Sequence, residues 1–203
     1  MEVPKAVDHD QRRAEIVRAA RVVLARDGID GATMRRIASE AQCTTGRITH
    51  YFVDKDDVMI AVLRSVHHSS RQRMEAALRE PDAQARLERV IEAALPLDAE
   101  RRDEWSIWMT FLAHAVHSAA LQAELKVRYD DWSALLAGVV EDDPGSEAVR
   151  RFVALIDGLG MRVTVDASSR LDIVRMIHDA VDAAGTRRSD VSRPSGAAEP
   201  GRR

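Results

Sequence analysis

The sequence lacks features that several protein classes require. Its single cysteine, Cys43, excludes an internal disulfide framework and a metal site built from cysteines alone. No apolar run approaches the roughly 18 residues that a membrane-spanning helix needs. Residues 1–5 are polar and lack the apolar core of a signal peptide. We therefore expect a cytoplasmic globular protein, and 203 residues suffice for one large domain or two small ones.

Catalytic and metal-binding patterns are equally scarce. There is no Gly-rich phosphate loop, no Ser or Cys nucleophile with a recognisable base, and no pair of carboxylates in a known catalytic arrangement. His114 and His117 would share a helix face, but no third metal ligand is identifiable. We expect neither an enzyme nor a bound metal or cofactor. A helical protein–protein adaptor or a small helical metalloenzyme without DNA binding is the alternative.

The pattern that is present is helical. The only β-branched alternation, residues 162–165, is too short to indicate a sheet, whereas apolar residues elsewhere recur at helical spacing. Nine helices are expected: from about Asp10 to Gly28, around Ile37, at 44–52, 55–79, 82–95, 101–119, 121–142, 146–166 and 170–184. The predicted fold is therefore all-α. Residues 186–203 hold almost nothing to bury, and we expect that tail to be disordered.

Charge is distributed unevenly along the chain. Residues 12–55 carry nine Arg or Lys against five Asp or Glu, whereas residues 56–185 carry fifteen against twenty-three. The overall formal charge of −3 thus conceals a basic N-terminal quarter. A basic segment on an acidic chain suggests that this segment meets a polyanion.

A short helix, a tight turn at 41–44 and a second short helix form the helix-turn-helix layout. Ile48 and Phe52 lie four residues apart, so one face of the second helix would pack inward. Its other face would expose Thr45, Arg47, Thr49 and His50. Arginine can bind guanine through two hydrogen bonds, and threonine can contact a thymine methyl group or a phosphate. This face is the candidate for reading double-stranded DNA.

Two runs within about residues 12–62 carry a family resemblance. They are Gly28-x-x-Gly31-Ala32-Thr33-Met34-x-x-Ile37-Ala38-x-x-Ala41 and Thr45-Gly46-x-Ile48-Thr49-His50-Tyr51-Phe52-x-Asp54-Lys55-x-x-Val58. They resemble the DNA-binding domain of the TetR family, most of all its choline-responsive BetI branch. The resemblance implies a repressor that binds a palindromic operator as a homodimer through its third helix. It also implies a C-terminal helical bundle that binds a small-molecule inducer.

The resemblance implies a domain at 1–54 for DNA binding, followed by a bundle at 55–185 for ligand binding and dimerisation. The implied DNA-binding residues are Thr33, Thr44, Thr45, Arg47, Thr49, His50, Tyr51 and Lys55. Thr33, Tyr51 and Lys55 would fix the backbone register, and the others would face bases or phosphates. The sequence departs from the family at the turn, where Gln42-Cys43-Thr44 stands in place of the usual Gly-Val-Ser.

Six of the eight aromatic residues lie in the C-terminal part. Five of them follow helical spacing and form the predicted ligand site: Trp105, Trp108, Phe111, Tyr129 and Trp132. Aromatic faces attract cations, and Asp130 and Asp131 stand beside Tyr129, so an inducer that is a cationic amine is expected. An amphipathic molecule of another kind remains an alternative, and the same rings could instead fill a helical core.

Apolar residues recur at three- and four-residue steps along the last two predicted helices. They form the predicted dimer interface: Val149, Phe152, Ile156, Leu159, Val163, Val174, Ile177 and Val181. Gly158 and Gly160 would allow the helices to approach closely. A two-fold mate would cover these stripes. The alternative is that both helices bury their stripes within one chain.

Overall fold

The computed structural model describes residues 5–140 and 143–166, which form eight α-helices and no strand. The helices are α1 (Lys5–Gly31), α2 (Met34–Glu40), α3 (Thr45–Tyr51), α4 (Lys55–Ala77), α5 (Ala83–Ala94), α6 (Ala99–Ala115), α7 (Ala119–Val140) and α8 (Glu147–Val165). The all-α prediction is confirmed, with eight described helices where nine were expected. The predicted helix 170–184 and tail 186–203 lie outside the described residues.

Side-chain caps explain where the helices begin. Thr33, Thr44 and Asp54 precede α2, α3 and α4, and each accepts a hydrogen bond from the backbone N–H three residues further on. Such caps satisfy one of the free N–H groups of a first turn. Asp82, Asp98 and Ser146 do the same for α5, α6 and α8. The predicted starts at residues 44 and 55 are therefore confirmed to within one residue.

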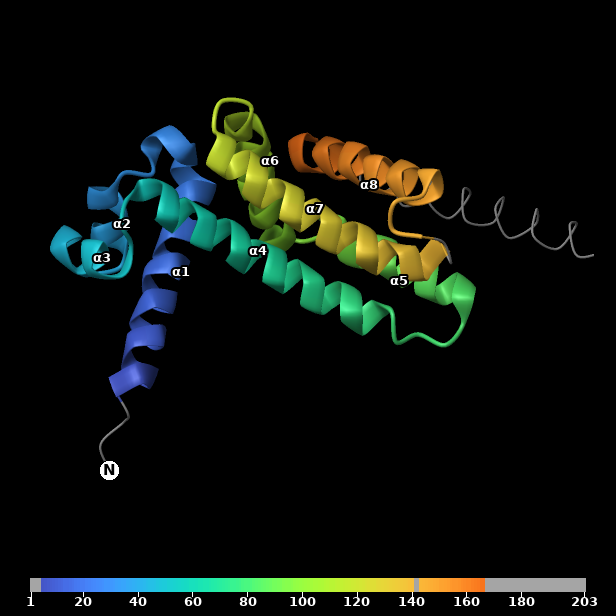
Figure 1. The fold of residues 1–203 in the computed structure, drawn as a ribbon, viewed down its shortest axis with the longest axis horizontal. Helices are drawn as coiled ribbons and strands as arrows, with labels where there is room; N and C mark the ends of the chain where they lie inside the picture. The colour runs from blue at the N-terminus through green and yellow to red at the C-terminus, as the bar shows by residue number, and fades with distance from the viewer. Residues whose placement is uncertain (1–4, 141–142, 167–203) are drawn as a thin grey trace, which may run out of the picture.

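Helices α1–α3 form a head at one end of the molecule, and α4 runs from this head along the body made by α5–α8 (Figure 1). Gly28 interrupts α1 with a φ of 67°, a backbone conformation that suits glycine. The bend lets the chain turn from α1 into α2. The predicted helix stop at Gly28 therefore corresponds to this interruption, while helical structure continues to Gly31.

Head and body share a hydrophobic core. Ile37, Ile48 and Phe52 of the head belong to the same buried cluster as Ile107 and Phe111 of α6. Buried side chains from both sides of the boundary predicted after residue 54 thus pack together in one core. A shift of α6 can therefore reach the head through direct contacts.

The α8 stripe predicted to face a second subunit lies inside the single chain. Val149, Ile156, Leu159 and Val163 are at most 8% exposed, because they pack against α4, α5 and α7. Phe152 is half-buried against the same clusters. The four buried residues therefore follow the intrachain alternative, whereas Phe152 is covered only in part. Val174, Ile177 and Val181 lie outside the described residues.

No helix in the described part of the chain is both long enough and apolar enough to cross a membrane.

Candidate nucleic-acid interface and ligand pocket

Helix α3 separates an inward apolar side from an outward polar side. Ile48 is fully buried, and Phe52, which caps the helix end, is 1% exposed. Thr45, Arg47, Thr49 and His50 are all exposed. The four residues predicted to face DNA therefore share a solvent-facing surface, hereafter called the reading face.

The turn before α3 is held without the glycine that is usual in the family. Gln42 adopts a φ of 51°, a left-handed conformation that is uncommon for a non-glycine residue. The N–H of Cys43 donates to the Ala38 carbonyl at 2.9 Å, and the half-buried Cys43 packs against the head core. Thr44 is exposed, and its hydroxyl caps α3 by accepting from the Arg47 N–H at 3.2 Å.

Three further predicted DNA contacts lie outside the reading face. Thr33 is exposed and caps α2. The half-buried ring of Tyr51 lies 4.6 Å from the ring of His9 in α1 and 5.0 Å from that of His50. The Lys55 ammonium group donates to the Ile29 carbonyl at 2.7 Å, so it joins α4 to the end of α1. Lys55 is thus half-buried beside the reading face and not on it.

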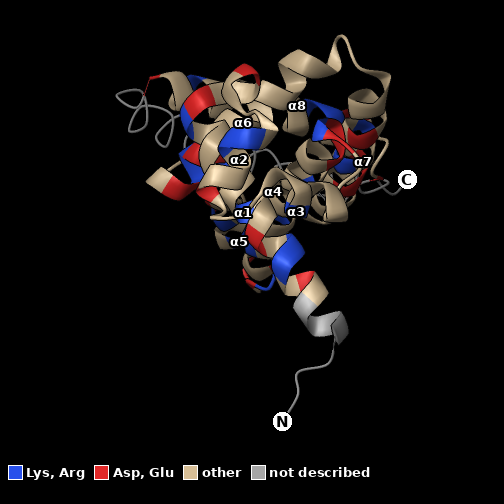
Figure 2. Ribbon diagram, turned by 90° about the vertical axis from the view of Figure 1, so that its left-hand side faces the viewer, with Lys and Arg blue, Asp and Glu red and all other residues tan. Residues whose placement is uncertain are grey.

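Many head arginines are already paired. Asp27 accepts hydrogen bonds from Arg26 at 3.0 Å and from Arg36 at 2.9 Å. These bonds lower the pKa of Asp27, and the bond from Arg26 has the larger effect. Figure 2 looks onto the head and shows basic positions interspersed with acidic ones. No ion pair to the Arg47 guanidinium is found among the described residues. Arg47 is therefore available to a phosphate or a base edge.

A pocket lies between α4, α6, α7 and α8. Its cavity has a volume of about 50 Å³ and opens to solvent. Four of the five predicted ligand residues line it: Trp105, Trp108, Tyr129 and Trp132. Phe111 is the exception, because it is fully buried in the core shared with the head.

The pocket walls are fixed by close contacts. The Trp105 indole N–H donates to the Ala94 carbonyl at 2.8 Å. A Cβ at Gly160 would come within 2.2 Å of the Trp105 ring, so only glycine leaves room for the ring there. Trp108 and Tyr129 pack edge to face with ring centroids 5.4 Å apart. The aromatic surface is therefore built before any ligand arrives.

Asp157 of α8 supplies an acidic group to this aromatic wall. Its carboxylate accepts a hydrogen bond from the Tyr129 hydroxyl at 2.9 Å. Burial raises the pKa of Asp157 despite that bond. The pKa of Tyr129 is raised as well, mainly by burial and next by the negative charge of Asp157. No Lys, Arg or His among the described residues pairs with this carboxylate. Its negative charge is therefore left for something that enters the pocket.

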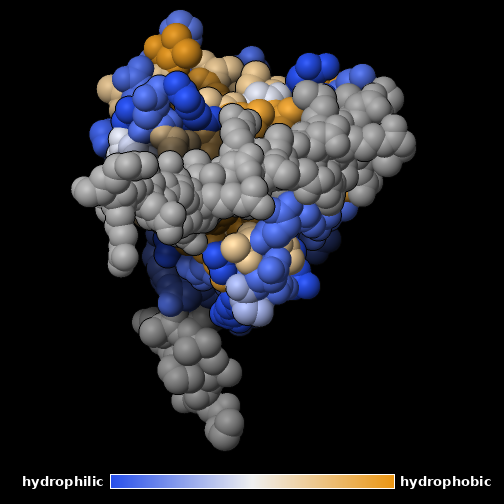
Figure 3. Space-filling model, turned by 90° about the vertical axis from the view of Figure 1, so that its right-hand side faces the viewer, coloured by the Kyte–Doolittle hydropathy of each residue, from blue (hydrophilic) through white to orange (hydrophobic). Residues whose placement is uncertain are grey.

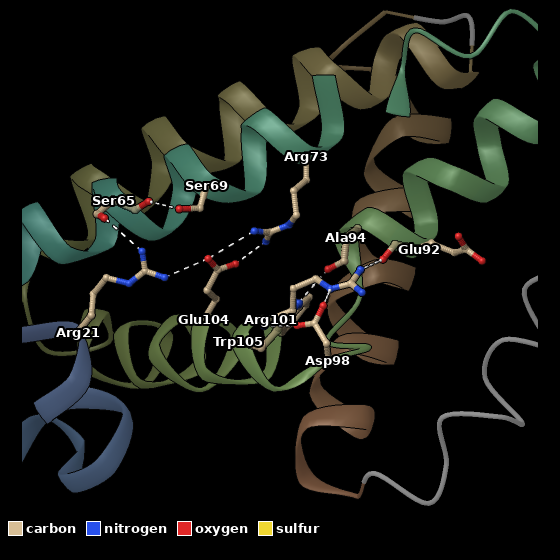
Figure 4. A network of polar contacts seen from close by, with 10 residues as sticks. All are labelled: Arg21, Ser65, Ser69, Arg73, Glu92, Ala94, Asp98, Arg101, Glu104 and Trp105. Carbon is tan, nitrogen blue, oxygen red and sulfur yellow. Dashed lines mark hydrogen bonds and ion pairs between the residues drawn. The ribbon is translucent and has the colours of Figure 1, made fainter. Parts of the chain in front are cut away.

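Glu104, the second acid of the pocket, is already paired with arginines. It is 3% exposed, and it accepts from Arg21 of α1 at 3.0 Å and makes a very short contact with Arg73 of α4. Figure 4 shows both guanidinium groups directed at the Glu104 carboxylate. One negative charge thus faces two positive ones. Glu104 cannot serve as the free counter-charge that Asp157 provides.

Sequence reasoning missed the polar lining of the pocket, which consists of Asp157, Glu104, Arg73, Ser70 and His67. Asp157 could have been noticed as the one acid among the apolar residues 152–156 and Leu159. The acids proposed instead, Asp130 and Asp131, are absent from the lining. His67 is 4% exposed. Burial lowers the pKa of His67, and the positive charge of Arg128 lowers it further.

The histidine pair considered for a metal does not share a helix. His114 lies in the last turn of α6, whereas the exposed His117 lies beyond the helix end at Ala115. In the described ranges, no three His, Cys, Asp or Glu side chains are grouped so that they could hold a metal ion.

Comparisons with known proteins agree with this geometry. Residues 16–62 match the family described as bacterial regulatory proteins, tetR family, and residues 83–186 match the BetI-type transcriptional repressor C-terminal family. The regulator PksA of Bacillus subtilis is 27% identical over 175 residues, which cover 81% of this chain and 84% of PksA. BetI of Burkholderia ambifaria is 27% identical over 191 residues, covering 89% and 97% of the two chains.

A solved structure extends the likeness to the fold. A transcriptional regulator from Saccharomonospora viridis, crystallised in complex with choline, superposes with a TM-score of 0.68 at 26% identity, covering 86% of this chain and 95% of that one. The second family match alone spans more than half of the 203 residues. The chain therefore belongs to the TetR family of bacterial transcriptional regulators and carries a C-terminal domain of the BetI type.

Proposed function

We propose that this TetR-family regulator is a repressor that an organic cation releases from DNA. The observation that carries the proposal is the Asp157 carboxylate inside an aromatic pocket, with no cationic partner in the described part of the chain, together with an exposed reading face. Members of this family regulate transcription and are not enzymes, so the alternative of an adaptor or a metalloenzyme is wrong for this chain.

Residues 1–54 serve as the DNA-binding part of the chain, and residues 55–185 bind the ligand and the second subunit. Arg47 contacts a base or a phosphate, supported by Thr45, Thr49 and His50 on the same exposed face. Thr33, Thr44, Tyr51 and Lys55 surround that face and hold phosphates. Phosphate contacts position such a helix, and base contacts give it sequence specificity.

The inducer is a compact organic cation. Asp157 supplies the opposite charge, while Trp105, Trp108, Tyr129 and Trp132 supply aromatic faces. A desolvated cation–π contact contributes about 2 kcal/mol, and a buried carboxylate adds direct attraction. The choline bound to the Saccharomonospora viridis relative is a cation of this class, which makes choline the first compound to test.

Calorimetric titration of the full chain with choline tests this assignment. Its uncharged carbon isostere, 3,3-dimethylbutan-1-ol, has the same shape and serves as the control ligand. We expect the isostere to bind at least about tenfold more weakly, because it gains neither the cation–π contact nor the ion pair. Asp157→Asn should reduce choline binding and leave isostere binding unchanged. Equal affinities for the two compounds would contradict a site selective for cations.

Dimerisation uses the outward face of α8. Leu155, Met161 and Val165 are 46%, 43% and 78% exposed. Figure 3 faces the end of the body away from the head and shows apolar areas next to hydrophilic ones. A second copy of the chain would bury this apolar face around a two-fold axis. The two reading faces would then contact related half-sites of one operator.

A further inference from the structure

Helix α6 bridges the pocket and the head. Near its start, Arg101 donates to the Glu92 carbonyl of α5, and Trp105 donates to the Ala94 carbonyl. Glu104, one residue before Trp105, reaches in the other direction to Arg21 of α1. Figure 4 shows two separate groups of contacts, one around Glu104 and one around Arg101 and Trp105. The Arg21–Glu104 ion pair therefore links the pocket wall, which includes Glu104, to the first helix of the head.

The buried Glu104 forms a triad with the half-buried Arg21 and Arg73. Arg73 lines the pocket together with Glu104, whereas Arg21 does not. Arg21 also donates to the Ser65 hydroxyl of α4 at 3.4 Å, so it contacts both helices that approach the head from the body. The triad has one member in the head and two at the pocket.

We infer that the Arg21–Glu104–Arg73 triad transmits pocket occupancy to the DNA-binding head. The inference rests on the proposed cation site. A cation held near Asp157 shares the pocket with the positively charged Arg73, and the two repel each other at low local dielectric. The same cation attracts the Glu104 carboxylate and competes with Arg73 for it. Both effects change how Glu104 holds Arg21, and hence the position of α1 that DNA binding requires.

This linkage has a thermodynamic consequence. If choline weakens DNA binding by a given factor, then DNA weakens choline binding by the same factor. Arg21 serves as a positioning residue for this coupling, since it touches neither the pocket nor the reading face. Loss of Arg21 should abolish the coupling and preserve both separate affinities. Glu104 would still be paired with Arg73, so the variant does not leave a buried charge without a partner.

The wild type is first used to enrich a DNA duplex from a random pool. The experiment then measures the choline affinity of the full chain, once free and once bound to that duplex. For the wild type we expect the two dissociation constants to differ by about 5- to 150-fold. For Arg21→Met we expect the ratio to fall to about one, with choline and duplex each still bound about as tightly as by wild type. Arg64→Met is the matched control, because Arg64 joins α4 to Glu124 of α7 instead of joining α1 to α6.

Arg21→Lys tests the same claim should Arg21→Met fail to fold. A single ammonium group lacks the forked geometry that reaches Glu104 and Ser65 together, so the ratio should fall below that of wild type. A wild-type ratio in a folded Arg21 variant would overturn the inference, as would an equal loss in Arg64→Met. A wild-type chain that binds neither choline nor tetraethylammonium would instead refute the cation pocket, and the inference would fall with it.

Discussion

Gly158 and Gly160 lie two residues apart on α8 but have different surroundings. A Cβ at Gly160 would lie 2.2 Å from the Trp105 ring, whereas a Cβ at Gly158 would meet nothing within 4 Å. Gly160→Ala should therefore destabilise the fold by about 1–3 kcal/mol through overpacking. Gly158→Ala should stabilise it by about 0.5–1 kcal/mol, because alanine favours the helix. Thermal unfolding measures both changes.

All three tryptophans of the chain line the pocket, so their fluorescence reports on the Gly160 variant directly. The emission of Gly160→Ala should shift relative to wild type, and that of Gly158→Ala should not. A Gly160→Ala variant with wild-type stability and emission would mean that the Trp105 ring does not occupy this position.

Asp157 couples stability to pH. Burial raises its pKa in the folded chain above the unfolded value, so the folded state binds this proton more tightly and loses stability as pH rises between the two values. Asp157→Asn removes that loss. We expect the melting temperature of the variant to exceed that of wild type at pH 7. This difference in melting temperature should disappear near pH 4, because below that pH Asp157 is protonated in both the folded and the unfolded wild type. Each 1 kcal/mol gained corresponds to roughly 2–4 °C.

Melting curves of wild type and Asp157→Asn from pH 4 to pH 8 give this difference. The same variant should bind choline more weakly, so stability and ligand affinity would change in opposite directions. A stability difference that grows toward acidic pH would contradict the raised pKa of Asp157.

At the scale of single helices, local chemistry allowed reliable prediction. Thr33, Thr44 and Asp54 begin their helices as caps, because short polar side chains before an apolar run satisfy free N–H groups. The four-residue spacing of Ile48 and Phe52 fixed which side of α3 packs inward. The same reasoning could not place Lys55, because its bond to the Ile29 carbonyl depends on how α1 and α4 meet.

Helix α3 carries the prediction for DNA recognition. Arg47→Ala should weaken binding to the enriched duplex by about 1–3 kcal/mol if Arg47 contacts a base, with little loss on random duplexes. Arg102→Ala, which removes an exposed arginine from α6 in the body, is the control and should leave both affinities unchanged. Fluorescence anisotropy at a fixed salt concentration measures them. Equal weakening on both duplexes would reduce Arg47 to a phosphate contact.

At the scale of the whole molecule, sequence periodicity identified apolar stripes but not the surfaces that cover them. Val149, Ile156, Leu159 and Val163 were correctly recognised as apolar, yet they pack within one chain. Phe111 was correctly assigned to a helix, but it points into the core shared with the head and not into the pocket. Both errors concern contacts between helices distant in sequence, which periodicity along one helix does not contain.

The exposed apolar face of α8 predicts which substitutions will weaken the dimer. Leu155→Glu and Met161→Glu each place a charge on the exposed apolar face, so each should shift the full chain from dimer toward monomer in sedimentation. Val116→Glu changes a more exposed apolar residue beyond the end of α6 and should leave the dimer intact. Two α8 variants that remain dimeric at micromolar concentration would assign dimerisation to another surface.

The central claim is that one chain joins a DNA-reading helix to a pocket selective for cations. Its most direct test is the affinity for the enriched duplex, with and without saturating choline, in wild type and in Asp157→Asn. We predict that choline weakens wild-type binding by about tenfold or more, which corresponds to about 1.4 kcal/mol, and leaves the variant unaffected. Wild-type DNA binding that does not change with choline, or an equal response in Asp157→Asn, would contradict the account.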